Sequence, residues 1–204
     1  MAVSLLYFLL VTILPQNYPN EPAVVTKIAT ALNDSTADGN VLFKFTVAGE
    51  ASVIVIVRVR SNAALDRITS RLRCTGYLEI RSQPIITYES HARNLNVSAD
   101  LTGPYEGTLQ PENIYWFNLR VDYNNKTTEE LLDIWKTEAE SFLGSRKSGS
   151  VRAVAFKNLG EREVQLFINA PQPDQFDLLL FNTPIVQAIG SDIRAMSKGV
   201  LFLN

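Results

Sequence analysis

The order of apolar segments along the chain is the feature that most constrains its fold. The first half predicts a strand, a helix, two strands, a helix and a strand, at Leu5–Ile13, Glu21–Asp34, Val41–Val47, Ser52–Arg60, Asn62–Leu72 and Tyr77–Tyr88. The second half repeats that order, at Ile114–Tyr123, Thr128–Leu143, Val151–Phe156, Glu163–Asn169, Asp174–Gln187 and Ile193–Leu203. The chain therefore contains the pattern β-α-β-β-α-β twice.

A unit of this pattern forms an antiparallel sheet with both helices on one face. The other face of the sheet is apolar and has to be covered. We therefore predict an α+β fold, in which two ferredoxin-like units pack sheet to sheet as an intramolecular, pseudo-dimeric α+β barrel. The predicted domains are residues 1–96, a linker over 97–113 that carries Gly and Pro, and residues 114–204.

The N-terminal run "MAVSLLYFLLVTILP" resembles the core of a signal peptide, but it has no basic residues before it and no typical cleavage site. It is also too short to span a bilayer. We interpret Leu5–Ile13 as a central strand buried on both faces, which predicts a cytoplasmic protein that keeps this segment. Secretion is the alternative, and the N-x-S/T triplets at Asn33, Asn96 and Asn125 would suit it.

Composition excludes several classes of function. The chain has 204 residues, of which 46 % are hydrophobic and 20 % charged, as in an ordinary globular protein. A formal net charge of −2 gives no basic face for nucleic acid and no polybasic patch for a membrane. One cysteine, Cys74, and one histidine, His91, cannot form a disulfide or a Cys/His metal site within the chain. We expect no metal and no cofactor, and we expect His91 to be an ordinary strand-end or loop residue.

One charge falls on an apolar helical stripe in the second half. In "LLDIWKTEAESF", the side chains of Leu131, Ile134, Trp135 and Phe142 recur every three or four residues, and Glu138 lies on the same stripe. Glu138 either lies at the edge of the stripe and reaches water, or is a carboxylate working inside a pocket.

The segment "GNVLFKFTVAGEASVIVIVRVRSNAALDRITSRLRCTGYLEIRSQP" resembles the muconolactone isomerases, small enzymes of the dimeric α+β barrel superfamily. The points of similarity are Gly39, Gly49, "SNAAL" and "YLEIRSQP". In the second half they are "LRVDY", Gly149–Arg152 and "DQFDLLL", with a small insertion around Asn158. The resemblance covers nearly the whole chain and rests mainly on scaffold positions, so it implies a tandem duplication of that fold.

The resemblance also implies a site. The isomerases move a proton within a small anionic lactone, which needs one carboxylate in a dry pocket and a cation for the substrate. Their basic residue in strand one, glutamate in helix one and arginine in strand two correspond here to Arg120, Glu138 and Arg152. The first half has only apolar residues at these positions, namely Leu10, Ile28 and Leu42. Smaller residues than in the family, at Ser150, Val151, Ala153 and Ala155, imply a larger or differently shaped cavity.

We therefore predict Glu138 as the catalytic residue and four substrate-binding residues, Arg120, Arg152, Trp135 and Asp122. The alternative for the two arginines is solvated charge at a strand edge, or an ion pair with Asp122. Three functions remain open: an isomerase or cyclase acting on a small organic acid, lactone or polyketide-like molecule; a binding protein without catalysis; and a structural or assembly protein. A homo-oligomer is compatible with each.

Overall fold

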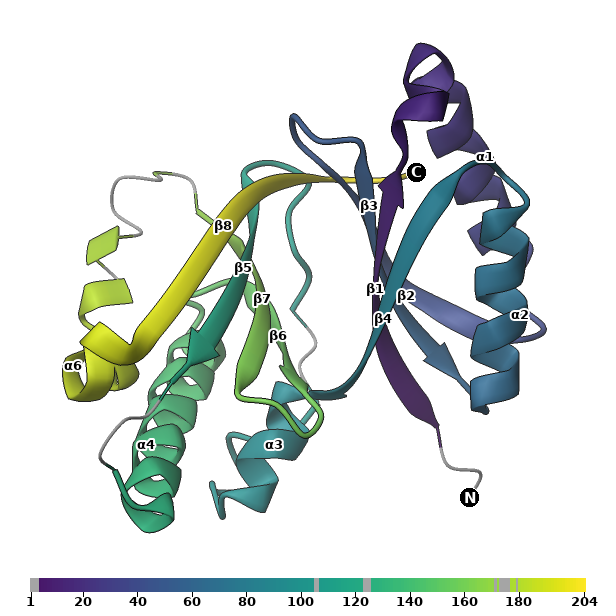
Figure 1. Cartoon of the computed structure of the whole chain (residues 1–204). Helices are drawn as coiled ribbons and strands as arrows, with labels where there is room; N and C mark the ends of the chain where they lie inside the picture. The colour runs from purple at the N-terminus through teal and green to yellow at the C-terminus, as the bar shows by residue number, and fades with distance from the viewer. Residues whose placement is uncertain (1–3, 105–106, 123–125, 171, 173–176, 179) are drawn as a thin grey trace. The chain divides into compact units, whose positions relative to one another are not determined.

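The computed structural model describes residues 4–104, 107–122, 126–170, 172, 177–178 and 180–204. Backbone contacts divide the chain into two compact units (Figure 1). The first contains residues 1–85 together with 200–204, and the second contains residues 86–199.

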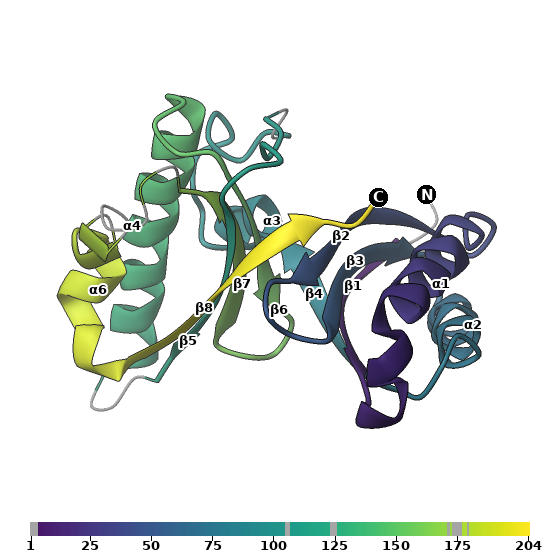
Figure 2. The same ribbon diagram turned by 90° about the horizontal axis from the view of Figure 1, so that it is seen from above.

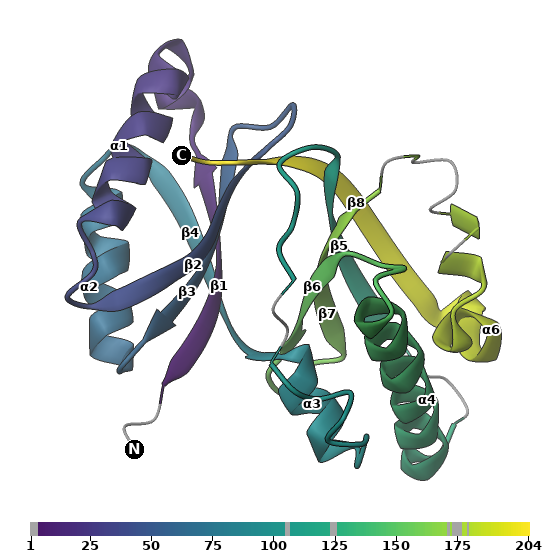
Figure 3. The ribbon, with the colours of Figure 1, turned by 180° about the vertical axis from the view of Figure 1, so that it is seen from behind.

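The first unit has the predicted order of elements. They are β1 (Leu5–Ile13), the 3₁₀ helix η1 (Pro15–Asn20), α1 (Glu21–Asn33), β2 (Gly39–Val47), β3 (Ser52–Val59), α2 (Asn62–Arg73) and β4 (Leu78–Thr87). The strands pair antiparallel in the order β4-β1-β3-β2, and the last residues of the chain pair with β2. Figure 3 shows α1 and α2 together on one face of this sheet.

The apolar N-terminal run forms a central strand, as predicted. β1 pairs with β3 along one edge and with β4 along the other. Leu9, Val11 and Ile13 face the helices and lie in one core cluster with Ile28 and Leu32, all of them almost fully buried. Because side chains alternate between the two faces of a strand, the neighbouring residues of β1 point to the other face.

The second unit repeats the strand order of the first. Its elements are α3 (Tyr88–Asn94), β5 (Ile114–Val121), α4 (Thr128–Lys147), β6 (Ala153–Asn158), β7 (Glu163–Asn169), α6 (Pro184–Ile189), the 3₁₀ helix η2 (Gly190–Asp192) and β8 (Ile193–Phe202). The strand order is β8-β5-β7-β6, with β5 in the place of β1. Figure 2 shows α4 and α6 on one side of this sheet. The mixed α+β class is as predicted, and the sheet-to-sheet pairing of the units stays a prediction.

The largest differences from the sequence prediction concern three helices. Helix α3 was not expected, because the strand pattern of β4 continues into Tyr88. The helix begins at Thr87, whose side chain accepts a hydrogen bond from the Ser90 backbone N–H. Helix α4 continues to Lys147. The predicted helix Asp174–Gln187 lies partly outside the described residues, and α6 begins at Pro184.

The predicted domain division stays a prediction, although contacts group residues 86–113 with the second unit. The glycosylation triplet at Asn125 also lies outside the described residues. Among the helices that the structure describes, none combines the length and the apolar character needed to cross a membrane.

The backbone geometry explains why two positions of the family resemblance are glycines. Gly49 has a φ of +77° in the turn between β2 and β3, a conformation that other residues adopt at a cost. Gly39 starts β2 against the end of β3, where a Cβ atom would lie 2.6 Å from the Arg58 carbonyl oxygen. Each position therefore follows from the backbone geometry of the first unit.

A capping box fixes the start of α4. The Thr127 side chain accepts a hydrogen bond from the Glu130 N–H, and the Glu130 carboxylate accepts one from the Thr127 N–H at 2.7 Å. These hydrogen bonds hold the pKa of Glu130 below its usual value. The cap sets where α4 begins and therefore which residues face the sheet.

Replacing Thr127 by Ala should lower the free energy of unfolding by about 1 kcal/mol, because it removes the cap. Chemical denaturation monitored by circular dichroism measures this. The control is Thr137→Ala on the same helix, whose hydroxyl only donates to the Asp133 carbonyl within the helix, and its effect should stay within about 0.5 kcal/mol. Equal losses in both variants would contradict the assignment.

Candidate functional site

The second unit contains a cavity of about 260 Å³ between its helices and its sheet. The lining is mostly apolar and comes from α3, α4, the segment around α6, and the helix-facing side of the strands. It consists of Tyr88, Leu119, Val121, Trp135, Glu138, Ser141, Phe142, Ser145, Val151, Ala155, Val164, Leu166, Ile168, Leu180, Asn182, Thr183, Ile185, Val186 and Ile193. Val151 and Ala155 are two of the small residues from which the sequence predicted a large cavity.

Glu138 lies in this lining, and it joins two helices. Its Oε2 atom accepts a hydrogen bond of 3.0 Å from the backbone N–H of Ile185, in the first turn of α6. The N-cap residue of α6, Thr183, makes no capping bond with its own side chain, since its hydroxyl donates to the Leu180 carbonyl. Burial raises the pKa of Glu138 above its usual value, and the hydrogen bond from Ile185 opposes that shift. The catalytic role of Glu138 stays a prediction.

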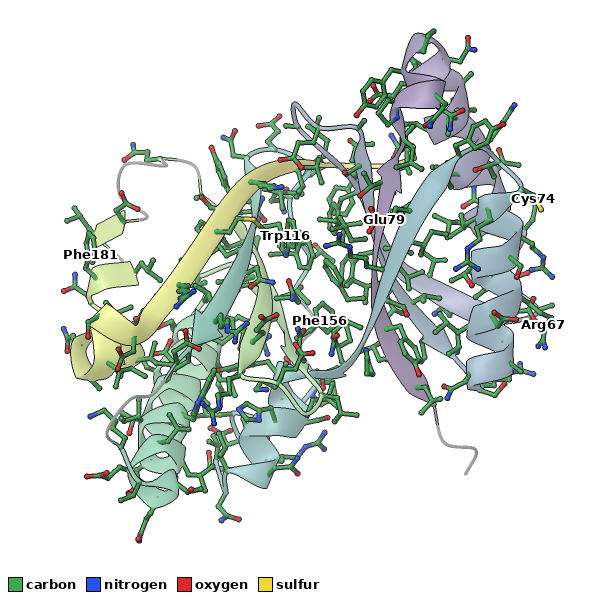
Figure 4. All side chains as sticks on the ribbon, in the orientation of Figure 1. Arg67, Cys74, Glu79, Trp116, Phe156 and Phe181 are labelled. Atoms are coloured by element: carbon green, nitrogen blue, oxygen red, sulfur yellow. The ribbon has the colours of Figure 1, made fainter. Side chains whose placement is uncertain are left out.

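The structure does not bring Arg120 and Arg152 to this cavity. In β5 the odd-numbered residues face α4. Ala153 and Ala155 of β6 do so too, as does Val151 just before the strand, and this alternation places both arginines on the other face of the sheet. Figure 4 labels Trp116 and Phe156, which lie on that other face by the same alternation. The charges of both arginines match the family pattern, but strand alternation turns them away from the cavity. The described lining contains no arginine or lysine.

The two arginines have other surroundings. The Arg120 side chain is 58 % exposed and forms ion pairs with Asp122 at 3.3 Å and Glu163 at 3.7 Å. Asp122 also pairs with Arg194 at 3.2 Å and does not line the cavity. Arg152 is exposed. The surface ion pair that was the alternative for Arg120 is therefore present.

Trp135 does line the cavity and is 5 % exposed. Of the first-half positions expected to fill the corresponding space, only Ile28 belongs to the core between sheet and helices. Leu10 and Leu42 are half-buried and lie outside that core cluster. For Leu10 the reason is again strand alternation, because Leu9 and Val11 take the helix-facing positions.

Tyr88 is a cavity residue that the sequence analysis missed. It is 3 % exposed and its ring meets that of Phe142 edge-on, with 5.2 Å between ring centroids. Burial raises the pKa of its hydroxyl strongly, and the negative charge of Glu138 raises it further. Tyr88 is the last residue of the predicted strand Tyr77–Tyr88. In the structure it is the first residue of α3, and this helix places its ring against α4.

His91 follows one turn later on α3. Burial, and the positive charge of Lys157, lower its pKa to about 4, so the ring is neutral at physiological pH. Its ring meets that of Trp135 edge-on, with 5.5 Å between ring centroids, and its Nε2 atom is buried without a hydrogen bond.

Among the described residues, no cluster of three or more His, Cys, Asp or Glu side chains could hold a metal ion.

No family model and no curated protein sequence matches this chain. Solved structures do match. Chlorite dismutase from Candidatus Nitrospira defluvii, in complex with imidazole, superposes with a TM-score of 0.61 at 10 % identity, over 98 % of this chain and 91 % of that chain. A candidate monooxygenase from Lactobacillus acidophilus NCFM superposes with a TM-score of 0.54 at 10 % identity, over 98 % and 94 %. These similarities show a shared mixed α+β fold and nothing beyond the fold; they do not show a relationship to the muconolactone isomerases.

Replacing Glu138 by Gln should stabilise the protein increasingly as the pH rises. Because the pKa of Glu138 is raised in the folded state, the folded protein binds this proton more tightly than the unfolded chain, and it loses stability as the pH rises through and above the usual carboxyl pKa. Gln carries no such penalty and its amide oxygen can still accept the Ile185 N–H. The melting temperature of the variant minus that of the wild type should therefore increase from about pH 4 to pH 8.

The matched control is Glu140→Gln, an exposed glutamate on the same helix. Its difference in melting temperature should change little with pH. A pH-independent difference for Glu138→Gln would contradict the burial of an ionisable group at this position.

Proposed function

We propose that the cavity of the second unit binds a small organic molecule and that Glu138 moves a proton within it, as in an isomerase or cyclase. The observation that carries this proposal is a half-buried carboxylate of raised pKa in an otherwise mostly apolar cavity. Such an environment makes a carboxylate a stronger base, and perturbed carboxylates in pockets are frequent at active sites.

The ligand that fits best is neutral. An anion would need a cation to compensate its burial, and the described lining offers none. We therefore prefer a lactone-like or polyketide-like molecule to the free organic acid that the family resemblance implied. A cavity of about 150 Å³ holds benzene, so about 260 Å³ accommodates one ring with substituents or two small rings.

The reaction needs no external oxidant or reductant. The Glu138 carboxylate takes a proton from the carbon next to the ligand's carbonyl group, and the electron pair of that C–H bond becomes the C=C bond of an enolate. The glutamic acid then returns the proton two carbons away, and the double bond shifts. One carboxylate completes both steps, so that its charge and the composition of the ligand are restored apart from the moved bond.

The repeated strand order supports a further part of the proposal. β4-β1-β3-β2 and β8-β5-β7-β6 are the same arrangement, which duplication of one ferredoxin-like unit would produce. We also propose a muconolactone isomerase-like ancestor, a cytoplasmic location and a homo-oligomeric state.

A second candidate function is binding without catalysis. The hydrogen bond from Ile185 to Glu138 favours it, since this carboxylate caps α6 and so has a structural reason to be buried. A structural or assembly protein needs the cap but not the cavity.

The test is proton exchange in deuterated buffer. The wild type should exchange or isomerise a β,γ-unsaturated lactone such as α-angelica lactone, or a β,γ-unsaturated cyclic ketone, faster than buffer does. Glu138→Gln should lower that rate by about 10²–10⁴-fold, because the amide cannot accept the proton. Nuclear magnetic resonance of the carbon-bound proton measures the rate, and Glu140→Gln serves as the control with wild-type activity.

Ligand binding without any exchange in the wild type would favour the carrier function. Equal exchange rates in the wild type and Glu138→Gln would contradict the proposal.

A further inference from the structure

We propose that Tyr88 is the second catalytic group of this site and that its hydroxyl donates a hydrogen bond to a carbonyl oxygen of the substrate. The substrate class is then a neutral carbonyl compound with a removable proton next to the carbonyl group, such as an unsaturated lactone or cyclic ketone. This inference deepens the proposed function and depends on it for the identity of the base.

The first support is the unsatisfied hydroxyl of a buried residue. Tyr88 is 3 % exposed and borders the cavity. None of the described residues forms a hydrogen bond with its hydroxyl group. A buried tyrosine usually finds a hydrogen-bond partner for this group. The hydroxyl oxygen is not one of the fully enclosed atoms that lack a partner, so it stays accessible to a ligand. A carbonyl oxygen of a ligand in the cavity would supply that partner.

The second support is the firm attachment of α3 to α4. Glu89 forms an ion pair with the buried side chain of Arg146. The ring of Tyr88 packs against Phe142, and that of His91 packs against Trp135. The three contacts join α3 to α4 at Trp135, Phe142 and Arg146, and they hold the tyrosine in one place. A hydrogen-bond donor acts on a transition state only if it is positioned in advance.

The third support is the protonation state of the pair. Burial and the charge of Glu138 both keep the Tyr88 hydroxyl protonated, so it is a donor throughout the physiological range. The neutral ring of His91 adds no positive charge nearby. One cavity thus holds a base and a neutral donor, an arrangement in which a carboxylate removes a proton while the donor stabilises the enolate oxygen. It explains how a cavity with no cation in its described lining could still support enolate chemistry.

The first test compares Tyr88→Phe with the wild type in the proton-exchange assay. The value of kcat should fall by about 10²–10³-fold, which is the usual effect of removing one donor to a developing oxyanion, with KM changing much less. The ring is retained, so the packing against Phe142 is preserved. The control is Tyr115→Phe, a half-buried tyrosine of the same unit that does not line the cavity, and it should keep the wild-type kcat.

The second test needs no catalysis. In Glu138→Gln, whose amide imitates the protonated base, the neutral chromophore 4-dimethylaminobenzaldehyde should bind with its carbonyl oxygen accepting a hydrogen bond from the Tyr88 hydroxyl. Adding Tyr88→Phe should weaken this binding by about 3–10-fold, because a hydrogen bond between neutral groups is lost. The absorbance change of the aldehyde on binding measures the dissociation constant, and Tyr115→Phe in the same background is the control.

The outcomes separate the two proposals. If the wild type shows no exchange but Tyr88→Phe still weakens aldehyde binding, the proton-transfer function fails and the role of Tyr88 as ligand donor stands. If Tyr88→Phe changes neither kcat nor aldehyde affinity, the inference about Tyr88 is overturned, while dependence of exchange on Glu138 keeps the proposed function.

Discussion

The hydrogen bond from the Ile185 N–H to the Glu138 carboxylate is the interaction on which the second unit's cavity depends. It connects α4 with the first turn of α6, whose own N-cap residue provides no side-chain cap. The bond orients one carboxylate oxygen and ties down the helix that forms one wall of the cavity. The same contact therefore explains how a carboxylate is tolerated in an apolar setting and why the cavity has a defined shape. A carboxylate with this structural role can also be a base, because only one of its oxygens is engaged by a described residue.

The fold was largely predictable because its signals are local. Period-two alternation marks the strands, and the stripe on α4 marks the helix that carries Glu138; the bounds of β1 and β7 agree with the structure to the residue. The position of Glu138 in the cavity was an open alternative in the sequence, and the packing of α4 on the sheet decides it. The order of the elements along the chain also reveals the repeat, since β5 occupies in the second unit the position that β1 has in the first.

The polar part of the site was less predictable, for two physical reasons. Arg120 and Arg152 were assigned from charges that match a family pattern, but a shift of one residue along a strand moves a side chain to the opposite face. Tyr88 was missed because its contacts with α4 join segments more than 50 residues apart, and nothing in its local sequence separates a strand end from a new helix. Strand alternation alone separates the two arginines from Glu138, whereas the position of Tyr88 depends on the tertiary structure.

The contrast between the units supports the proposal that the cavity is a functional site. In the first unit, the space between helices and sheet is closed by fully buried aliphatic residues, of which Ile28 is one. The second unit has Glu138 on its corresponding helix and the small side chain of Ala155 on the facing strand. An unfilled cavity and a buried carboxylate each destabilise a domain, and both could be removed by ordinary aliphatic residues such as those of the first unit. The cavity and the carboxylate are two destabilising features at the same position. Such a combination is expected where a ligand is bound, because natural sequences depart from good packing mainly at functional sites.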